Sequence, residues 1–165
     1  MATEKSPGEL IQEAIVGLLE DGAASLTIGG RVPTILDEMP GERFSQKGMP
    51  LVLVDTPVKD SDEDFGGNEG SEMWQVPILL IDAVGVRKDT RLAGERRLML
   101  LAEKVKHFLL GHDDRNWGLA RLAVFASMTE WAIGSPTEEV GNNLLILPIK
   151  VAVGCTVPVG TIFTS

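Results

Sequence analysis

The chain has 165 residues, which matches one domain and is long enough to bury a core without a metal ion or a disulfide. Its formal net charge is −9, and this excess of acids disfavours non-specific nucleic-acid binding, which depends on lysine and arginine contacts to phosphates. The single cysteine excludes an internal disulfide and a cysteine-rich zinc site.

The first residues lack the basic segment and apolar run of a signal peptide. The longest apolar stretches, residues 76–86 and 144–153, are about half as long as a membrane-spanning helix requires. Asp82 interrupts the first stretch and Lys150 the second. We therefore expect that the protein is made in a cytoplasm and does not associate with a membrane.

The first predicted element is a helix from Pro7 to Asp21. Ser6 and Glu9 have the spacing of a capping box, and Pro7 occupies the first helical position. Gly22 is a typical residue for the end of a helix. Apolar residues recur between them at helical spacing on one stripe: Leu10, Ile11, Ala14, Ile15, Leu18 and Leu19.

The next segment is rich in turn signals. Gly29 and Gly30 favour a tight hairpin turn, because both accept positive φ. Residues 33–50 combine Gly, Pro and charge and predict an irregular connection, and Leu51–Val54 reads as a short apolar strand. Residues 55–72 hold seven acids and one base, so we expect a long acidic loop here. We expect residues 60–72 of this loop to be mobile and not needed for folding.

A long strand is predicted over residues 72–86, apolar on both faces at its centre, with Pro77 at an edge or a bulge. Asp89 is a good N-cap for a second amphipathic helix over residues 89–110. Two further strands follow. They are expected over residues 119–131 and 143–153, with about one helical turn at 135–138 between them and a C-terminal tail at 156–165.

Together these elements predict a single α+β domain over residues 1–165. Both helices have one apolar stripe, and the strands have at least one strongly apolar face. We expect a mixed or antiparallel sheet of about four or five strands, with the two main helices packed on one face.

The acidic loop raises the question of a calcium site. Asp60, Asp62 and Asp64 match the first three ligand positions of an EF-hand loop. Phe65 stands where that loop requires glycine, and Ser71 stands where it requires glutamate. We favour a solvated loop and keep a weak divalent-cation site as the alternative.

The other reactive residues form no catalytic pattern. His107 and His112 are five residues apart with Gly111 between them, so they are not a metal-binding pair. Asp113 and Asp114 beside His112 are typical of a polar loop after a helix, and Cys155 lies among valines as a small buried residue does. We therefore predict no catalytic, metal-binding or cofactor-binding residue and no enzyme activity.

Basic residues cluster once in the chain, at the start of the second predicted helix. Two interpretations stay open: a solvated helix start, or a contact surface for a partner's carboxylates. Trp74, Trp117 and Trp131 lack the interleaved basic residues of a nucleic-acid platform and are predicted in the core or an interface. The basic cluster comprises Arg87, Lys88, Arg91, Arg96 and Arg97.

The order of these elements resembles the tail terminator (tail completion) proteins of long-tailed bacteriophages. The likeness is carried by the opening helix, the run from Trp74 to Asp82, the helix at 91–111 and the strands at 119–129 and 144–153. It covers nearly the whole chain and rests on element order, size and hydrophobic pattern.

This resemblance implies a structural virion protein with no catalytic residues. Members of the family form a hexameric ring that caps the tail tube and joins the tail to the head connector. Its expected partners are other copies of the chain and the tail-tube, sheath or head-connector proteins, while DNA passes through the ring without specific binding. The protein would be made in the host bacterial cytoplasm and end in the tail or neck of the virion.

Residues 60–72 have no counterpart in the family pattern. The alternatives are a head-completion or tail-tube protein of the same particle, or a small-ligand-binding protein or enzyme. In a ring we expect sheet edges and the C-terminal segment to make the contacts between subunits, because long strands that are apolar on both faces need a partner.

Overall fold

A computed structural model describes most of the chain, and the described residues form two α-helices, a short 3-10 helix and strands in two sheets. The larger sheet has seven strands in the order β2-β3-β5-β8-β6, with β4 beside β5 and β7 beside β8. β2 and β3 are parallel, and the other pairs of this sheet are antiparallel. The described residues are 4–38, 49–64, 69–83, 88–110, 125–134, 137–139, 144–158 and 163–164.

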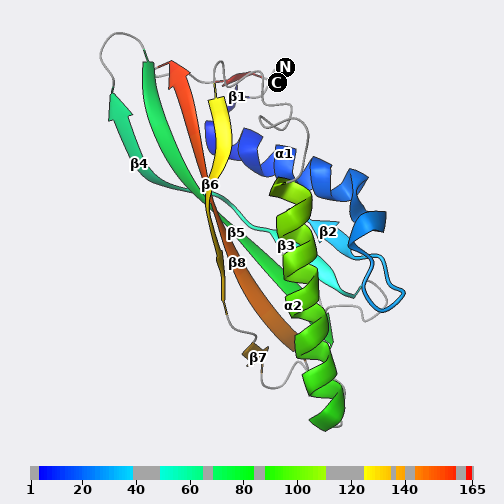
Figure 1. Cartoon of the computed structure of the whole chain (residues 1–165). Helices are drawn as coiled ribbons and strands as arrows, with labels where there is room; N and C mark the ends of the chain where they lie inside the picture. The colour runs from blue at the N-terminus through cyan, green and yellow to red at the C-terminus, as the bar shows by residue number, and fades with distance from the viewer. Residues whose placement is uncertain are drawn as a thin grey trace.

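The elements have the following bounds. The helices are α1 (Pro7–Asp21), η1 (Ala23–Leu26) and α2 (Lys88–Leu110). The strands are β1 (Glu4–Lys5), β2 (Thr34–Leu36), β3 (Leu51–Val54), β4 (Val58–Asp64), β5 (Glu69–Ala83), β6 (Phe125–Ile133), β7 (Thr137–Glu139), β8 (Leu144–Pro158) and β9 (Phe163–Thr164). The predicted α+β class with a mixed sheet is therefore confirmed (Figure 1).

Helix α1 begins at the predicted capping box. The backbone N–H of Ser6 donates to Glu9 Oε2 at 2.6 Å, and the backbone N–H of Glu9 donates to Ser6 Oγ at 3.3 Å. These two bonds satisfy backbone donors that a helix start otherwise leaves without partners. At the other end, the N–H of Gly22 donates to Leu18 O at 3.0 Å, and the predicted bounds of α1 are confirmed.

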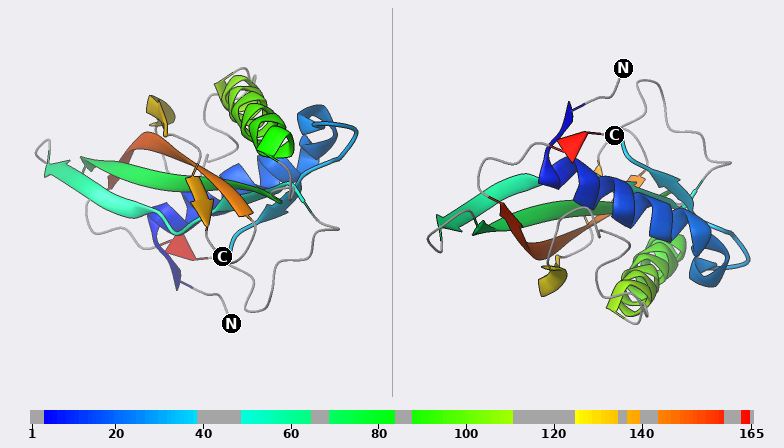
Figure 2. Two further views of the ribbon diagram at one scale, coloured as in Figure 1. Left: turned by 90° about the horizontal axis from the view of Figure 1, so that it is seen from below. Right: turned by 90° about the horizontal axis from the view of Figure 1, so that it is seen from above.

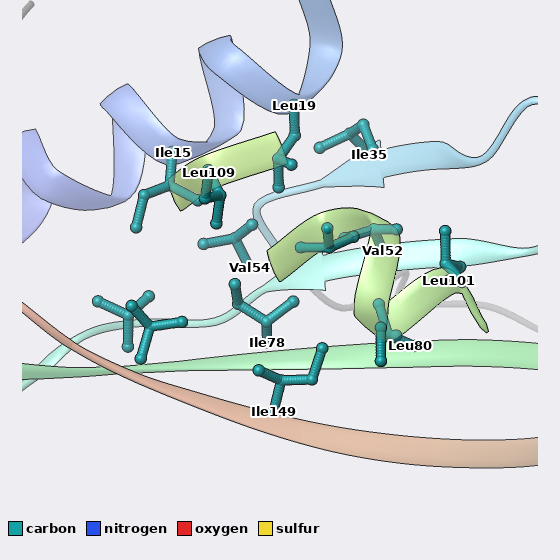
Figure 3. Packing of buried hydrophobic residues seen from close by; sticks show 14 of the residues in the cluster. Ile15, Leu19, Ile35, Val52, Val54, Ile78, Leu80, Leu101, Leu109 and Ile149 are labelled. Carbon is teal, nitrogen blue, oxygen red and sulfur yellow. The ribbon is translucent and has the colours of Figure 1, made fainter. Parts of the chain in front are cut away.

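The main core lies between the two helices and one face of the sheet. β5 and β8 pair in register from Glu69↔Pro158 to Ala83↔Leu144, so alternate side chains of both strands face the helices. Figure 3 shows side chains from α1 and α2 converging on side chains from β3, β5 and β8. The labelled residues of this core include Ile15, Leu19, Leu101, Leu109, Val52, Val54, Ile78, Leu80 and Ile149.

The predicted acidic loop over residues 55–72 is wrong. β4 and the start of β5 occupy most of it and pair from Val58↔Gln75 to Asp64↔Gly70, while residues 65–68 lie outside the described part of the chain. Backbone pairing with β5 satisfies the amide groups on the inner edge of β4. Charged residues are common on edge strands, because they discourage pairing with other chains.

Pro77 lies inside the sheet, where the neighbour of β5 changes from β3 to β4. The N–H of Asp55 donates to Pro77 O at 2.9 Å, and ladder pairing with β3 ends at Val54↔Ile78. The N–H that Pro77 lacks thus falls at an interruption of the ladder, where it is least needed.

Several predicted bounds also change. β5 spans Glu69–Ala83 and so begins three residues before the predicted 72–86, whose last residues lie outside the described part of the chain. The connection predicted over 33–50 contains β2, which pairs in parallel with β3. The helical turn expected at 135–138 is wrong, because β7 pairs there with β8. The predicted tail at 156–165 contains the end of β8 and β9, and β9 pairs with β1 across the two chain ends.

The remaining strands and α2 lie close to their predicted positions. α2 starts one residue before the predicted 89–110, and β8 continues past the predicted 143–153 to Pro158. β6 covers the second half of the strand predicted over 119–131, whose first residues lie outside the described part. The sheet separates α2 on one side from the β1–β9 pair on the other (Figure 2).

Candidate functional site

The residues considered for a cation site lie on β4. Asp60, Asp62 and Asp64 belong to an extended strand, so the wrapped loop that an EF-hand requires is not formed there. Within the described ranges, no group of three or more His, Cys, Asp and Glu residues could hold a metal ion. The acids of this segment are therefore part of a hairpin.

The other residues singled out in the sequence do not come together as far as the structure describes them. His107 is exposed on α2, with its Nε2 atom 3.6 Å from Glu103 Oε2. Cys155 lies on β8 opposite Glu72, and Trp131 lies on β6 opposite Val151. The candidates that lie outside the described residues are Arg87, His112, Asp113, Asp114 and Trp117.

Asp82 is the one buried charged residue in the described part of the chain, with 5% of its surface exposed. Its Oδ1 accepts the N–H of Ala83 at 2.8 Å, and its Oδ2 lies 3.4 Å from Nε of Arg97 on α2. The charge of Asp82 is therefore paired, and the ion pair joins β5 to α2. Sequence reasoning noted Asp82 as an interruption of an apolar run but did not find its partner.

A hollow of about 170 Å³ opens beside this ion pair. Gly29 and Gly30 have positive φ values of 59° and 77°, and Ile28 and Arg31 form a β-bridge across them, which confirms the predicted tight turn. The hollow offers a paired carboxylate and guanidinium, with no nucleophile in its lining. It is lined by Ile28, Gly29, Arg31, Pro50, Asp82 and Arg97.

The face of the sheet away from the helices has a small second core. Met49, Leu51, Ile81 and Leu144 are buried there, while Leu36, Leu79 and Ile146 are half-buried around them. Further along β8 on this face, Pro148 and Lys150 are exposed. The far face is thus apolar at one end, next to β3, and open to water at Pro148 and Lys150, while Ala152 beyond them is buried.

Helix α2 exposes apolar side chains opposite its core stripe. Leu92, Met99 and Leu100 are 49%, 53% and 53% exposed, and the side chain of Arg96 is exposed between them. At 3.6 residues per turn these four positions share one side of the helix, which we call the α2 outer face (Leu92, Arg96, Met99 and Leu100).

The sheet extends past the helices at the end that lies opposite the start of α2. Gly8 at the start of α1 packs on Trp74 of β5, and the strand continues from there to Glu69, beside β4 and the end of β8. We call residues 58–64 and 69–72 the acidic arm, because they contain six acids and one base. Figure 1 places the acidic arm at the upper left and the start of α2 at the bottom.

At the base of the acidic arm, side chains from both strands contact one another. Lys59 Nζ lies 3.3 Å from Glu72 Oε1 and 5.6 Å from the centroid of the Trp74 ring. Trp74 Nε1 donates to Glu72 Oε2 at 2.9 Å. These contacts fix β4 against β5 at the point where the arm leaves the helix-covered core.

Similarity to known proteins is found in the fold and not in the sequence. No model of a protein family matches the chain, and no curated protein matches it in sequence. The fold is similar to that of a chain in the solved structure of the virion of a native gene transfer agent particle, with a TM-score of 0.58 and 13% sequence identity. The match covers 92% of this chain and 99% of that one.

No helix in the described residues is both long enough and apolar enough to cross a membrane.

Proposed function

We propose that this protein is a structural virion protein that forms a hexameric ring at the end of a phage-type tail. In this role it caps the tail tube and joins the tail to the head connector. The observation that carries the proposal is the shared fold with a chain of a gene transfer agent virion over nearly the full length of both chains. The element order of tail terminator proteins, noted in the sequence, supports the same role.

The surfaces of the chain support an assembly subunit. β4 forms an edge that pairs with β5 and with no other described strand. The α2 outer face exposes three large apolar side chains. Unpaired edges and apolar patches of this kind are typical of surfaces that contact partner chains.

The proposal also assigns a place in the particle. The subunit is made in the host bacterial cytoplasm and assembles with tail-tube and sheath or head-connector proteins. An assembly of −9 subunits would be strongly negative and would not hold DNA that passes through the ring. No chemical step is assigned to the chain.

The test is the size and shape of the purified full-length protein, alone and with tail tubes. We expect mass photometry to show a species of six times 17.8 kDa, and negative-stain images to show closed six-fold rings. Rings should also bind to the ends of purified tail tubes. A protein that stays at 17.8 kDa at high concentration and does not bind tail tubes would contradict the proposal.

The same experiment separates the alternatives. A tail-tube protein would polymerise into open tubes of variable length, because its contact would stack rings as well as close them. A head-completion protein would bind purified connectors and leave tail tubes alone. An enzyme or small-ligand-binding protein would remain a small species and would show a ligand-dependent rise in thermal stability.

A further inference from the structure

Resting on the proposed ring, we infer that neighbouring subunits join head to tail, with the acidic arm of one copy docked on the α2 outer face of the next. This contact places carboxylates of a second copy of this chain against the exposed Arg96 and the basic start of α2. It also explains why the chain extends a charged edge strand beyond its own core.

The first observation is the composition of the α2 outer face. Three of the five large apolar side chains that are exposed in the described residues lie on this face: Leu92, Met99 and Leu100. Arg96 lies among them and is exposed, and Arg91 is exposed one turn earlier, 3.2 Å from Glu95 Oε1. A patch in which apolar side chains surround a basic one favours a partner that brings carboxylates together with some apolar surface.

The second observation is the composition of the acidic arm. Val58 at the start of β4 is 61% exposed, and Asp60 beside it is exposed. The outer edge of β4 adds backbone groups that no described strand pairs with. The arm therefore offers carboxylates, an apolar side chain and an open strand edge within one short segment.

The third observation is that the charges of the two surfaces are complementary. The arm has six acids against one base, while residues 88–97 at the start of α2 have four bases against two acids. The positive end of the α2 dipole adds to this attraction, because it lies at the same end of the helix as the basic residues. Two arms would repel each other, so edge-to-edge pairing of β4 strands is disfavoured.

The fourth observation is placement. The acidic arm and the start of α2 lie at opposite ends of the elongated sheet, so one copy does not satisfy its own arm (Figure 1). Two different surfaces at opposite ends of a subunit produce a head-to-tail contact, and such a contact closes into a ring when its rotation permits. The geometry thus fits the ring without a twofold interface.

The test reverses the charge of each surface in the full-length chain. The arm variant carries Asp60→Lys, Asp62→Lys and Asp64→Lys, which leaves three acids against four bases in the arm. The helix variant carries Lys88→Glu and Arg96→Glu, which leaves two bases against four acids in residues 88–97. The matched control for Arg96→Glu is Lys150→Glu, an exposed base on the far face of the sheet.

We expect each variant alone to need at least about tenfold more protein than the wild type to form rings, because like charges now face each other. An equimolar mixture of the two variants should restore rings, since each arm then meets a helix of opposite charge in strict alternation. The control should assemble like the wild type, and higher salt should weaken wild-type rings. Circular dichroism of each variant verifies that it is folded.

The outcomes separate this contact from the proposed function. If the wild type forms rings and both variants do so at the same concentration, the arm–helix contact is wrong and the ring stands. If the variants fail alone and also fail when mixed, the contact is likewise wrong, because charge pairing should rescue folded subunits. If the wild type forms no ring and binds no tail tube, the proposed function fails and this contact fails with it.

Discussion

The indole ring of Trp74 occupies the space that a Cβ atom on Gly8 would need, since that atom would overlap with Cζ3 of the ring. The start of α1 therefore rests directly on the strand that leads into the acidic arm. Trp74 is 8% exposed, and its Nε1 is held by Glu72, so the ring has little room to move aside.

Replacement of Gly8 by alanine should destabilise the protein. The added methyl group forces Trp74 or the first turn of α1 to shift, and overpacking of this kind typically costs about 1–3 kcal/mol. Chemical unfolding of wild type and Gly8→Ala measures the difference. The control is Gly17→Ala, where nothing lies within 4 Å of the new atom, and which should raise stability by about 0.5–1 kcal/mol.

The two adjacent arginines of α2 should behave differently when each is replaced by methionine. Arg97→Met leaves the buried Asp82 carboxylate without its cation, and an unsatisfied buried group of this type costs about 1–3 kcal/mol. Arg96→Met changes an exposed side chain and should stay within about 0.5 kcal/mol of the wild type. Urea unfolding of dilute protein measures both, and equal losses would contradict the role of the ion pair.

Aspartate substitutions on β8 should distinguish the two faces of the sheet. Ile149 is 2% exposed in the core beneath the helices. A carboxyl group there must be neutralised and left without a partner in place of an apolar side chain, and the combined cost is comparable to the typical total stability of about 5–15 kcal/mol. Ile149→Asp should therefore abolish folding, whereas Ile146→Asp on the half-buried far face should leave a folded but weakened chain. Circular dichroism of the soluble fractions measures this, with Ile149→Val as the mild control, at about 0.5–1.5 kcal/mol.

The capping box should make part of the stability depend on pH. The backbone N–H and the hydroxyl of Ser6 hold the pKa of Glu9 below its usual value of 4.5. The ionised carboxylate thus stabilises the folded state above that value, and this contribution is lost as pH falls through the lower pKa of the folded chain. Glu9→Gln should reduce stability at pH 7 and have less effect near pH 3, as unfolding curves of both proteins at each pH would show.

Helix α1 and the tight turn were predictable because their signals are local. Ser6, Pro7 and Glu9 act within one helical turn, and the apolar stripe follows the helical period whatever the rest of the chain does. Gly29 and Gly30 likewise accept positive φ without help from neighbouring strands. The α+β class follows from the same local patterns. Each helix has one apolar stripe that must be buried, and the predicted strands supply a sheet on which it can pack.

The hairpin of β4 and β5 was not predictable in the same way. Asp60, Asp62 and Asp64 have low strand propensity and a high local charge, which together favour a loop. What decides the outcome is β8, which pairs with β5 along its entire length. This pairing holds β5 extended as far as Glu69, so that the opposite edge of β5 is available to β4. Such long-range pairing leaves no period or composition signal in the segment that it orders.

The sequence by itself determined the two helices, the tight turn, the apolar centres of the long strands and the separation of an acidic segment from a basic one. All of these depend on neighbours within one or two turns of chain. The tertiary structure alone decided that the acidic segment is an arm, that Asp82 pairs with Arg97, and that Leu92, Met99 and Leu100 stay uncovered. Each of those outcomes depends on which distant surface happens to lie opposite, and solvent exposure is a property of the packed chain that no single segment encodes.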